Sequence, residues 1–412
     1  MKLKLDDRLW IALFSVGLIG ILGYVFWMYF MPEWKDYQAE FREIVEEKFG
    51  AARTQQAPMG VQQIWVKDLN RTDRCTTCHL GIEWKGMESA PQPYRTHPKE
   101  ILDKHPVNRY GCTVCHGGQG YAVDMDNAHA VSVEHWEQPL LGQELAQAYT
   151  VSQREALMQV NCNMCHRYDR EVKGANLTNH AKQLVSQKGC RACHKINGRG
   201  GAVGPDLTNV GALAPEQYNY ARLSGKAAVF AWHTAHFKDP KSMSQGTVMP
   251  NFGFSSRDAH ALTLLVMSWK DIDLPPQYIP GFKHVDVPTP EEQEKEKQML
   301  TGEGAFFVRK GCFICHDISS LGIESAAKIG PDLSIAVTDV QARFGKTLED
   351  FLKNPTGTMA VVLSTQIQLS EDERKEAVER LHLAFERKQQ GADRAAKSKP
   401  VAATAKQKGQ TQ

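Results

Sequence analysis

The pattern C-x-x-C-H occurs five times in this chain and uses all ten of its cysteines. In each copy, two thiols separated by two residues are followed directly by an imidazole. The copies begin at Cys75, Cys112, Cys162, Cys190 and Cys312. No cysteine is left for another purpose, so whatever this pattern binds determines how most of the chain can fold.

Three kinds of chemistry use a C-x-x-C pair. A structural zinc site takes four ligands, commonly from two such pairs, so five pairs leave one over, and zinc gives no reason for the histidine. A thioredoxin-like dithiol occurs once, near a βαβ pattern, and does not need the histidine either. Covalent haem explains the whole pattern, because two thioethers join the vinyl groups and the next residue is placed under the iron.

We therefore predict five covalently bound haem c groups. The attachment residues are Cys75, Cys78, Cys112, Cys115, Cys162, Cys165, Cys190, Cys193, Cys312 and Cys315. The proximal iron ligands are His79, His116, His166, His194 and His316.

An uncharged apolar run extends from Leu9 to Met31, and about twenty such residues are enough to cross a bilayer. It is too long for the apolar region of a signal peptide, and no cleavage site of small residues follows it. Because Lys2, Lys4 and Arg8 precede the run, the positive-inside rule places the N-terminus in the cytoplasm. We predict a single-span protein of the bacterial inner membrane with its haem domains in the periplasm, where haem c is attached.

The remaining composition predicts a mainly α chain with loop-rich haem regions. The near-balanced charge of +2 gives no case for a nucleic-acid partner. The predicted organisation begins with a cytoplasmic start and transmembrane anchor (1–32) and a stalk region (33–70), whose amphipathic helix ends at Gly50. A loop-rich dihaem domain (71–150) and a second dihaem region (151–273) follow. The chain continues with a proline-rich extended linker (274–298), a last haem domain (299–386) and a disordered tail (387–412).

Two haem units repeat one another. KGCRACH is followed by GPDL at Gly204, and KGCFICH is followed by GPDL at Gly330. Each copy then leads to a methionine and a terminal amphipathic helix. The first of these helices follows a serine cap, and Ser370 and Glu373 have the spacing of a capping box before the second.

These units resemble class I cytochrome c domains over roughly 179–270 and 300–386. The segment MPNF at Met249 is similar to that family's distal signature. The resemblance implies two helical domains in which Met249 is the sixth ligand of the haem on His194 and Pro205 supports the proximal side. It implies Met359 as the corresponding ligand for the haem on His316.

The distal ligands of the other haems come from the remaining histidines. Four candidates surround the first two motifs, which favours bis-histidine ligation there. His97 and His105 are the alternatives for the distal ligand of one iron, and His129 and His135 are the alternatives for the other. For the haem on His166 the candidate is His180, with Met158 and Met164 as alternatives.

Other histidines have weaker contexts. We expect His233 and His236 to pack beside the fourth haem, and nothing distinguishes His260, His284 and His382. If the first haems are bis-histidine and the last are histidine–methionine, reduction potential should rise along the chain.

The whole chain resembles the membrane-anchored multihaem cytochromes of quinol-oxidising complexes, such as bc-type complexes and alternative complex III. The anchor, the five motifs and the segment HPVNRYGCTVCHGGQG carry this resemblance. It implies partner subunits in a membrane redox complex and electron transfer to a soluble cytochrome, an oxidase or another periplasmic acceptor, without catalysis by this chain.

Two alternatives remain open. One is a multihaem enzyme with an open iron at His166, acting on a nitrogen oxide or peroxide. The other is a quinol dehydrogenase with a single helix, which would need a quinone pocket at the membrane interface near Trp34.

Overall fold

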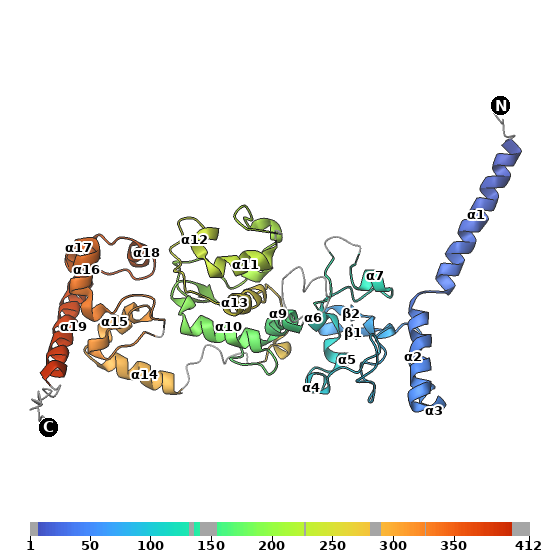
Figure 1. Cartoon of the computed structure of the whole chain (residues 1–412), viewed down its shortest axis with the longest axis horizontal. Coiled ribbons are helices and arrows are strands. Elements are labelled where there is room, and N and C mark those ends of the chain that lie inside the picture. The colour runs from blue at the N-terminus through green and yellow to red at the C-terminus, as the bar shows by residue number, and fades with distance from the viewer. Residues whose placement is uncertain are drawn as a thin grey trace, which may run out of the picture. The chain divides into compact units, whose positions relative to one another are not determined.

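The computed structural model describes residues 7–131, 136–140, 155–225, 228–280, 290–325 and 327–397. The chain divides into two compact units, residues 1–161 and 162–412. Helices supply most of the regular structure (Figure 1), and the strands among the described residues form two antiparallel pairs. The prediction of a mainly α chain is confirmed.

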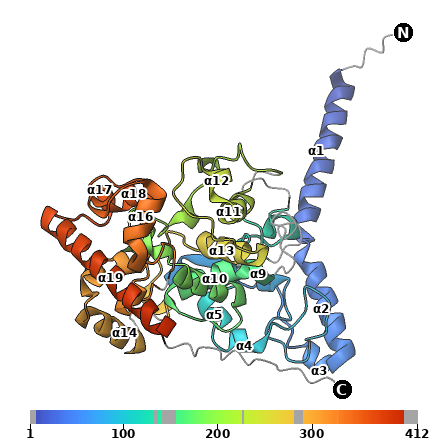
Figure 2. The same ribbon diagram turned by 60° about the vertical axis from the view of Figure 1, so that its left-hand side comes forward.

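The first helix, α1 (Asp7–Phe30), has 24 residues and no buried side chain. At 1.5 Å per residue it is about 36 Å long, enough for a hydrocarbon core of about 30 Å. It extends away from the rest of its unit in both views (Figures 1 and 2). Its length and composition are those of a membrane-crossing helix.

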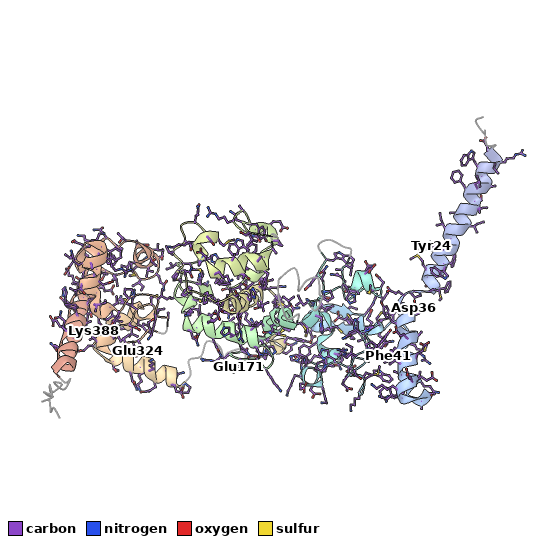
Figure 3. The ribbon with its side chains drawn as sticks, viewed as in Figure 1. Tyr24, Asp36, Phe41, Glu171, Glu324 and Lys388 are labelled. Carbon is purple, nitrogen blue, oxygen red and sulfur yellow. The ribbon has the colours of Figure 1, made fainter. Side chains whose placement is uncertain are left out.

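The second helix, α2 (Trp34–Phe49), packs on the haem-bearing part of the first unit. Phe41 (labelled in Figure 3) and Val45 on one face are fully buried. The ring centroid of Phe41 lies 5.2 Å from that of Trp84 and 5.7 Å from that of Tyr94. Gly50, with φ of 83°, ends the helix, because a positive φ suits glycine. The helix therefore ends at the glycine where the sequence predicted its end.

The rest of the first unit consists of short elements. They are α3 (Ala51–Thr54), β1 (Ile64–Val66), β2 (Arg71–Asp73), α4 (Lys99–Leu102), α5 (Val107–Tyr110), α6 (Thr113–His116) and α7 (Met125–Ala128). Strands β1 and β2 pair with Ile64 opposite Asp73 and Val66 opposite Arg71. Helices of a single turn contribute little stability of their own, so this region depends on what its loops bind.

The second unit begins with a helical domain. Its elements are α10 (Asn176–Gln187), β3 (Lys195–Ile196), β4 (Arg199–Gly200), α11 (Val229–Lys238), α12 (Pro240–Met243) and α13 (Ser256–Met267); α9 (Glu155–Cys165) precedes them and crosses the boundary between the units. Helix α13 packs against α10 and α11. The Ser255 hydroxyl accepts a hydrogen bond from the Asp258 amide, which confirms the predicted serine cap. Leu262, Leu265 and Trp269 are buried in this core.

The second unit ends with another helical domain. Its helices are α14 (Pro290–Thr301), α15 (Ala305–Arg309), α16 (Ala336–Phe344), α17 (Leu348–Lys353), α18 (Thr358–Thr365) and α19 (Glu371–Lys397). The Glu373 amide donates to the Ser370 hydroxyl and the Ser370 amide donates to the Glu373 carboxylate, so the predicted capping box is formed. Lys388 of α19 donates to Asp332, which ties the helix to the loop after the fifth motif (Figure 3).

Two predicted boundaries differ from the structure. The linker was expected to be extended to residue 298, but α14 starts at Pro290, since proline suits the first turn of a helix and the following residues favour helix. The tail was expected to be disordered from Arg387, but α19 continues to Lys397, because alanine, arginine and lysine favour the helix. Residues 398–412 lie outside the described part.

Candidate haem-binding sites

Two pairs of imidazole rings face each other in the first unit. The ring centroids of His97 and His116 are 6.1 Å apart with an interplanar angle of 87°. Those of His79 and His129 are 6.2 Å apart with an angle of 79°. The pairing is crossed, because His97, between the two motifs, faces the second motif and His129, after both, faces the first.

This spacing fits a metal between two imidazoles. A metal–imidazole bond is about 2.0 Å long, and a ring centroid lies roughly 1.1 Å behind its nitrogen, so two axial ligands place their centroids about 6.2 Å apart. Two rings that only pack against each other could lie at other distances, yet both histidine pairs have centroids close to 6.2 Å apart. The geometry of His97 with His116 and of His79 with His129 therefore suits an iron between each pair.

The other ring nitrogens orient these ligands. Nδ1 of His97 donates to the Pro98 carbonyl at 3.2 Å, and His79 bonds the backbone of Pro93. Such bonds fix the tautomer and leave Nε2 with a lone pair for a metal. Burial, followed by the neighbouring His129 and His116, lowers the pKa of His79 to about 4, so the ring is neutral, as a ligand must be.

A buried carboxylate joins the first two motifs. Asp73 is fully buried, and its carboxylate accepts from the amides of Cys112 and Thr113 at 2.6 and 3.0 Å and from the Thr113 hydroxyl at 2.7 Å. A side chain at Gly111 or Gly120 would collide with this carboxylate. Asp73 therefore holds the second motif against the strand that leads into the first.

The attachment thiols of the first two motifs are in direct contact. Cys75 and Cys112 hydrogen bond with one another through their side chains. Groups attached at these two sulfurs would approach each other closely. None of the ten cysteines forms a disulfide, and the described residues contain no cluster of three or more His, Cys, Asp or Glu side chains that would hold a metal by protein ligands alone.

A cavity of about 660 Å³ opens beside His79. Its lining includes Ile64, Leu80, Trp84 and Val107. Cofactor sites are commonly of this order of volume. The cavity and the facing imidazoles together fit a haem attached at Cys75 and Cys78.

The two repeated units of the second unit hold their proximal histidines in the same way. Nδ1 of His194 donates to the Pro205 carbonyl at 2.9 Å, and Nδ1 of His316 donates to the Pro331 carbonyl at 2.8 Å. Each Nε2 is thereby left for a metal. The backbone hydrogen bonds repeat as well. The amide of Gly204 donates to the carbonyl of Cys193, and the amide of Gly330 donates to the carbonyl of Cys315, both at 2.8 Å.

Glycine is required beneath both rings. A Cβ at Gly204 would lie 2.5 Å from Cε1 of His194, and a Cβ at Gly330 would lie 2.2 Å from Cε1 of His316. The glycine of GPDL therefore exists because the proximal imidazole packs on its backbone. This relationship is visible in the sequence only as a repeated tetrapeptide.

An aromatic cluster lies near His194. His233 is buried and bonds the Tyr218 hydroxyl at 3.0 Å, and His236 stacks on Trp232 with centroids 5.0 Å apart. Burial, then the neighbouring His194, lowers the pKa of His236 to about 4. The Tyr220 hydroxyl and Nδ1 of His236 are buried without a hydrogen-bond partner, and such atoms suit a polar group of a bound haem. No sequence pattern pointed to Tyr220.

The third motif is tied to the helical domain that follows it. Nδ1 of His166 lies 2.6 Å from the Asp169 carboxylate, and Lys182 of α10 donates to the carbonyls of both residues. Arg167 donates to Asn197 and to the Thr208 carbonyl. Met158 and Met164 both lie half-buried on α9.

Several predicted ligands are placed elsewhere. Nε2 of His180 lies 2.6 Å from the Asp258 carboxylate, so the nitrogen that would bind iron instead links α10 to α13, and we do not retain His180 as a ligand. His105 donates to the Ile101 carbonyl and lies beside Tyr110. His135 lies outside the described residues.

The two predicted methionine ligands lie in their expected segments. Met249 is half-buried between α12 and α13. Met359 is the second residue of α18 and packs against the C-terminal core. Of the remaining histidines, His260 lies beside Phe230, His382 lies near Glu349, and His284 is outside the described residues.

Comparison with known proteins agrees with this geometry. The family model described as cytochrome c matches residues 178–270. A cytochrome c oxidase subunit 2 of Alkalihalophilus pseudofirmus is 33% identical over 113 residues, which cover 25% of this chain and 31% of the relative. The chain thus spans about a third of that relative's length. No solved structure matches.

A helical domain that seats a C-x-x-C-H histidine on a proline carbonyl is a haem c electron-transfer domain. Residues 178–270 form a cytochrome c domain.

Proposed function

We propose that this chain is a membrane-anchored cytochrome with five haem c groups that conducts electrons from the quinol side of a membrane redox complex to periplasmic acceptors. The observation that supports it most is the crossed pairing of His97 with His116 and of His79 with His129, around two motifs whose thiols touch. An iron with two histidine ligands has no open coordination position for a substrate, and two such irons close together exchange electrons with each other.

A second close pair supports continued conduction in the second unit. Cys193 of the fourth motif and Cys315 of the fifth lie near enough to interact electrostatically. Ala327, beside the fifth motif's loop, occupies the space where Gly189 would carry a Cβ. The haems on His194 and His316 would therefore be neighbours.

The ligand types give the conduit a direction. In our proposal the first two irons are bis-histidine, while Met249 and Met359 complete the irons on His194 and His316. A thioether ligand raises the potential relative to imidazole. Electrons then move from the membrane-side pair toward the C-terminal domains.

The cellular setting follows from the anchor. We place the N-terminus in the bacterial cytoplasm and the haem domains in the periplasm, with α1 as the single span among partner subunits. A relative named as an oxidase subunit supports an oxidase as one acceptor, and a soluble cytochrome is the other.

Electron paramagnetic resonance with low-temperature magnetic circular dichroism tests the proposal, applied to the oxidised holoprotein alongside a potentiometric titration. We expect five haems, two of them low-spin bis-histidine with the lowest potentials, and low-spin histidine–methionine irons with the highest. Five overlapping potentials would remove the direction, and a stoichiometric high-spin iron would contradict a pure conduit.

A further inference from the structure

A groove of about 500 Å³ lies on α2 at the point where the chain leaves the membrane helix. It is lined by Trp34, Lys35, Gln38, Ala39, Arg42 and Met59, among others. Trp34 is the first residue of α2 and follows the last residue of α1, Phe30, by four positions. The groove therefore starts at the membrane surface.

The groove also reaches the first haem motif. Gln38 is buried, and its Nε2 donates to the Thr77 carbonyl at 3.1 Å and to the Gly60 carbonyl at 2.7 Å. Thr77 lies between Cys75 and Cys78, inside the haem attachment loop. An occupant of the groove would thus be separated from the haem on His79 by one buried side chain.

The height of the groove suits a lipid-soluble molecule. Gln38 is four residues beyond Trp34, a rise of about 6 Å along the helix. The polar layer on each side of a bilayer is about 5–7 Å thick. A head group held at Gln38 would therefore lie in or just above this layer, with its tail among the lipids.

The charges around the groove favour a neutral occupant. Two cations, Lys35 and Arg42, are balanced by two carboxylates, Glu43 and Glu46. A phosphate would meet as many negative as positive groups, so the lining does not select an anion. A neutral head group whose hydroxyls donate protons fits this mixture, because the carboxylates accept protons and the cations do not.

We infer that this groove binds the head group of a quinol, which delivers its electrons to this chain directly. The inference rests on the proposed electron-carrying function and names the donor site. Oxidation of one quinol to the quinone releases two electrons and two protons. The electrons reduce two ferric irons, first at His79 and through it at His116, and the protons pass to Glu43 and Glu46 and then to water.

The experiment uses the full holoprotein in nanodiscs, with quinols of the benzoquinone and naphthoquinone types that carry short alkyl tails. Ala39→Trp fills the groove from α2, and Met59→Trp fills it from the opposite wall; both side chains are exposed, so the larger residues need not disturb the core. Glu47→Trp, on an exposed part of the same helix outside the groove, is the matched control.

We expect a quinol to reduce the wild-type haems, and either filling variant to slow that reduction and to weaken quinone binding in calorimetry by about tenfold or more, since binding provides the proximity. Glu47→Trp should stay within about twofold, a change of less than ~0.5 kcal/mol in the barrier. A filling variant as fast as the wild type would overturn the site.

A second outcome separates the site from the conduit. If no quinol reduces the wild type, while dithionite does and the reduced protein then passes electrons to a soluble cytochrome, the groove is not a donor site but the electron carrier stands. Loss of dithionite reduction, or of transfer to the soluble cytochrome, would contradict the carrier itself.

Discussion

The imidazoles of His97 and His116 stand 6.1 Å apart and nearly perpendicular, although nineteen positions separate them in the chain (116 − 97 = 19). His105 is nearer to the second motif in sequence, yet its ring packs against that of Tyr110, with centroids 5.1 Å apart. The fold, and not distance along the chain, therefore decides between two histidines eight residues apart.

The choice between His97 and His105 is tested by replacing each with alanine. We expect His97→Ala to convert one haem to a high-spin iron, because its sixth ligand is removed, and to leave the other four unchanged. His105→Ala is the control and should leave every iron low-spin. Electron paramagnetic resonance of the oxidised proteins counts the high-spin irons, and a new high-spin signal in His105→Ala alone would reverse the assignment.

The attachment residues and the proximal histidines can be predicted from the sequence because their chemistry is local: thiols two residues apart and an adjacent imidazole reach one haem. Which histidine lies opposite each proximal histidine depends on contacts between residues far apart in the sequence. His97 and His129 face motifs across a fold held by Asp73, whose contacts with Cys112 and Thr113 have no sequence signature.

The same limit explains His180. His180 is a candidate from the sequence because it lies in the short segment between the third and fourth motifs, but α10 places it opposite the capping carboxylate Asp258 of α13. Two helices that cross in the fold brought together residues 78 positions apart. The groove at Trp34 was anticipated only as a requirement of one alternative, since its far wall comes from Met59 and Gly60.

Gly330 should be intolerant of any side chain. In Gly330→Ala the added Cβ would lie 2.2 Å from the His316 ring, so the imidazole must shift from under the iron. We expect a loss of about 1–3 kcal/mol, as for an overpacked core, and an altered spectrum of one haem. Gly302→Ala is the control, because nothing lies within 4 Å of its Cβ position. Thermal unfolding and visible spectra check both, and a normal haem spectrum in Gly330→Ala would contradict the argument.

Met249 and His236 belong to the same domain as His194, and our proposal makes Met249, not His236, the distal ligand of that haem. We expect Met249→Ala to abolish the methionine-to-iron charge-transfer band of that haem and to lower its potential, because the thioether favours ferrous iron. His236→Ala should retain the band, since His236 stacks on Trp232. Spectra and potentiometry distinguish the two, and loss of the band in His236→Ala would reassign the ligand.

Asp73 should tune the haem pair that it joins. A buried negative charge favours the ferric state of nearby irons. Asp73→Asn keeps the shape of the side chain but removes this charge. At an effective dielectric of 20, two unit charges interact by about 4 kcal/mol at 4 Å and proportionately less at greater separation. We expect the two lowest potentials to rise by tens of millivolts, as measured by potentiometric titration. Unchanged potentials in a protein that retains five haems would exclude this role.

Asp332 should make the C-terminal domain sensitive to acid. Burial alone would raise the pKa of this carboxyl, but hydrogen bonds from Ser319 and Ser334 outweigh it and hold the pKa well below the usual range. Lys388 adds a contact at 3.2 Å. Because the folded-state pKa is depressed, the stabilisation is fully present above the unfolded value of about 3.9 and is lost as the pH falls through the folded value.

Asp332→Asn should therefore lower the free energy of unfolding by about 1–2 kcal/mol at neutral pH, and the difference from the wild type should shrink below about pH 4. Glu324→Gln is the control, because Glu324 is exposed and its ion pair with Lys295 is long, at 3.6 Å; exposed pairs contribute about 0–1 kcal/mol. Denaturant unfolding at neutral and acidic pH measures both differences. A deficit in Asp332→Asn that stays constant into acid would show that Asp332 acts through its shape and not through its charge.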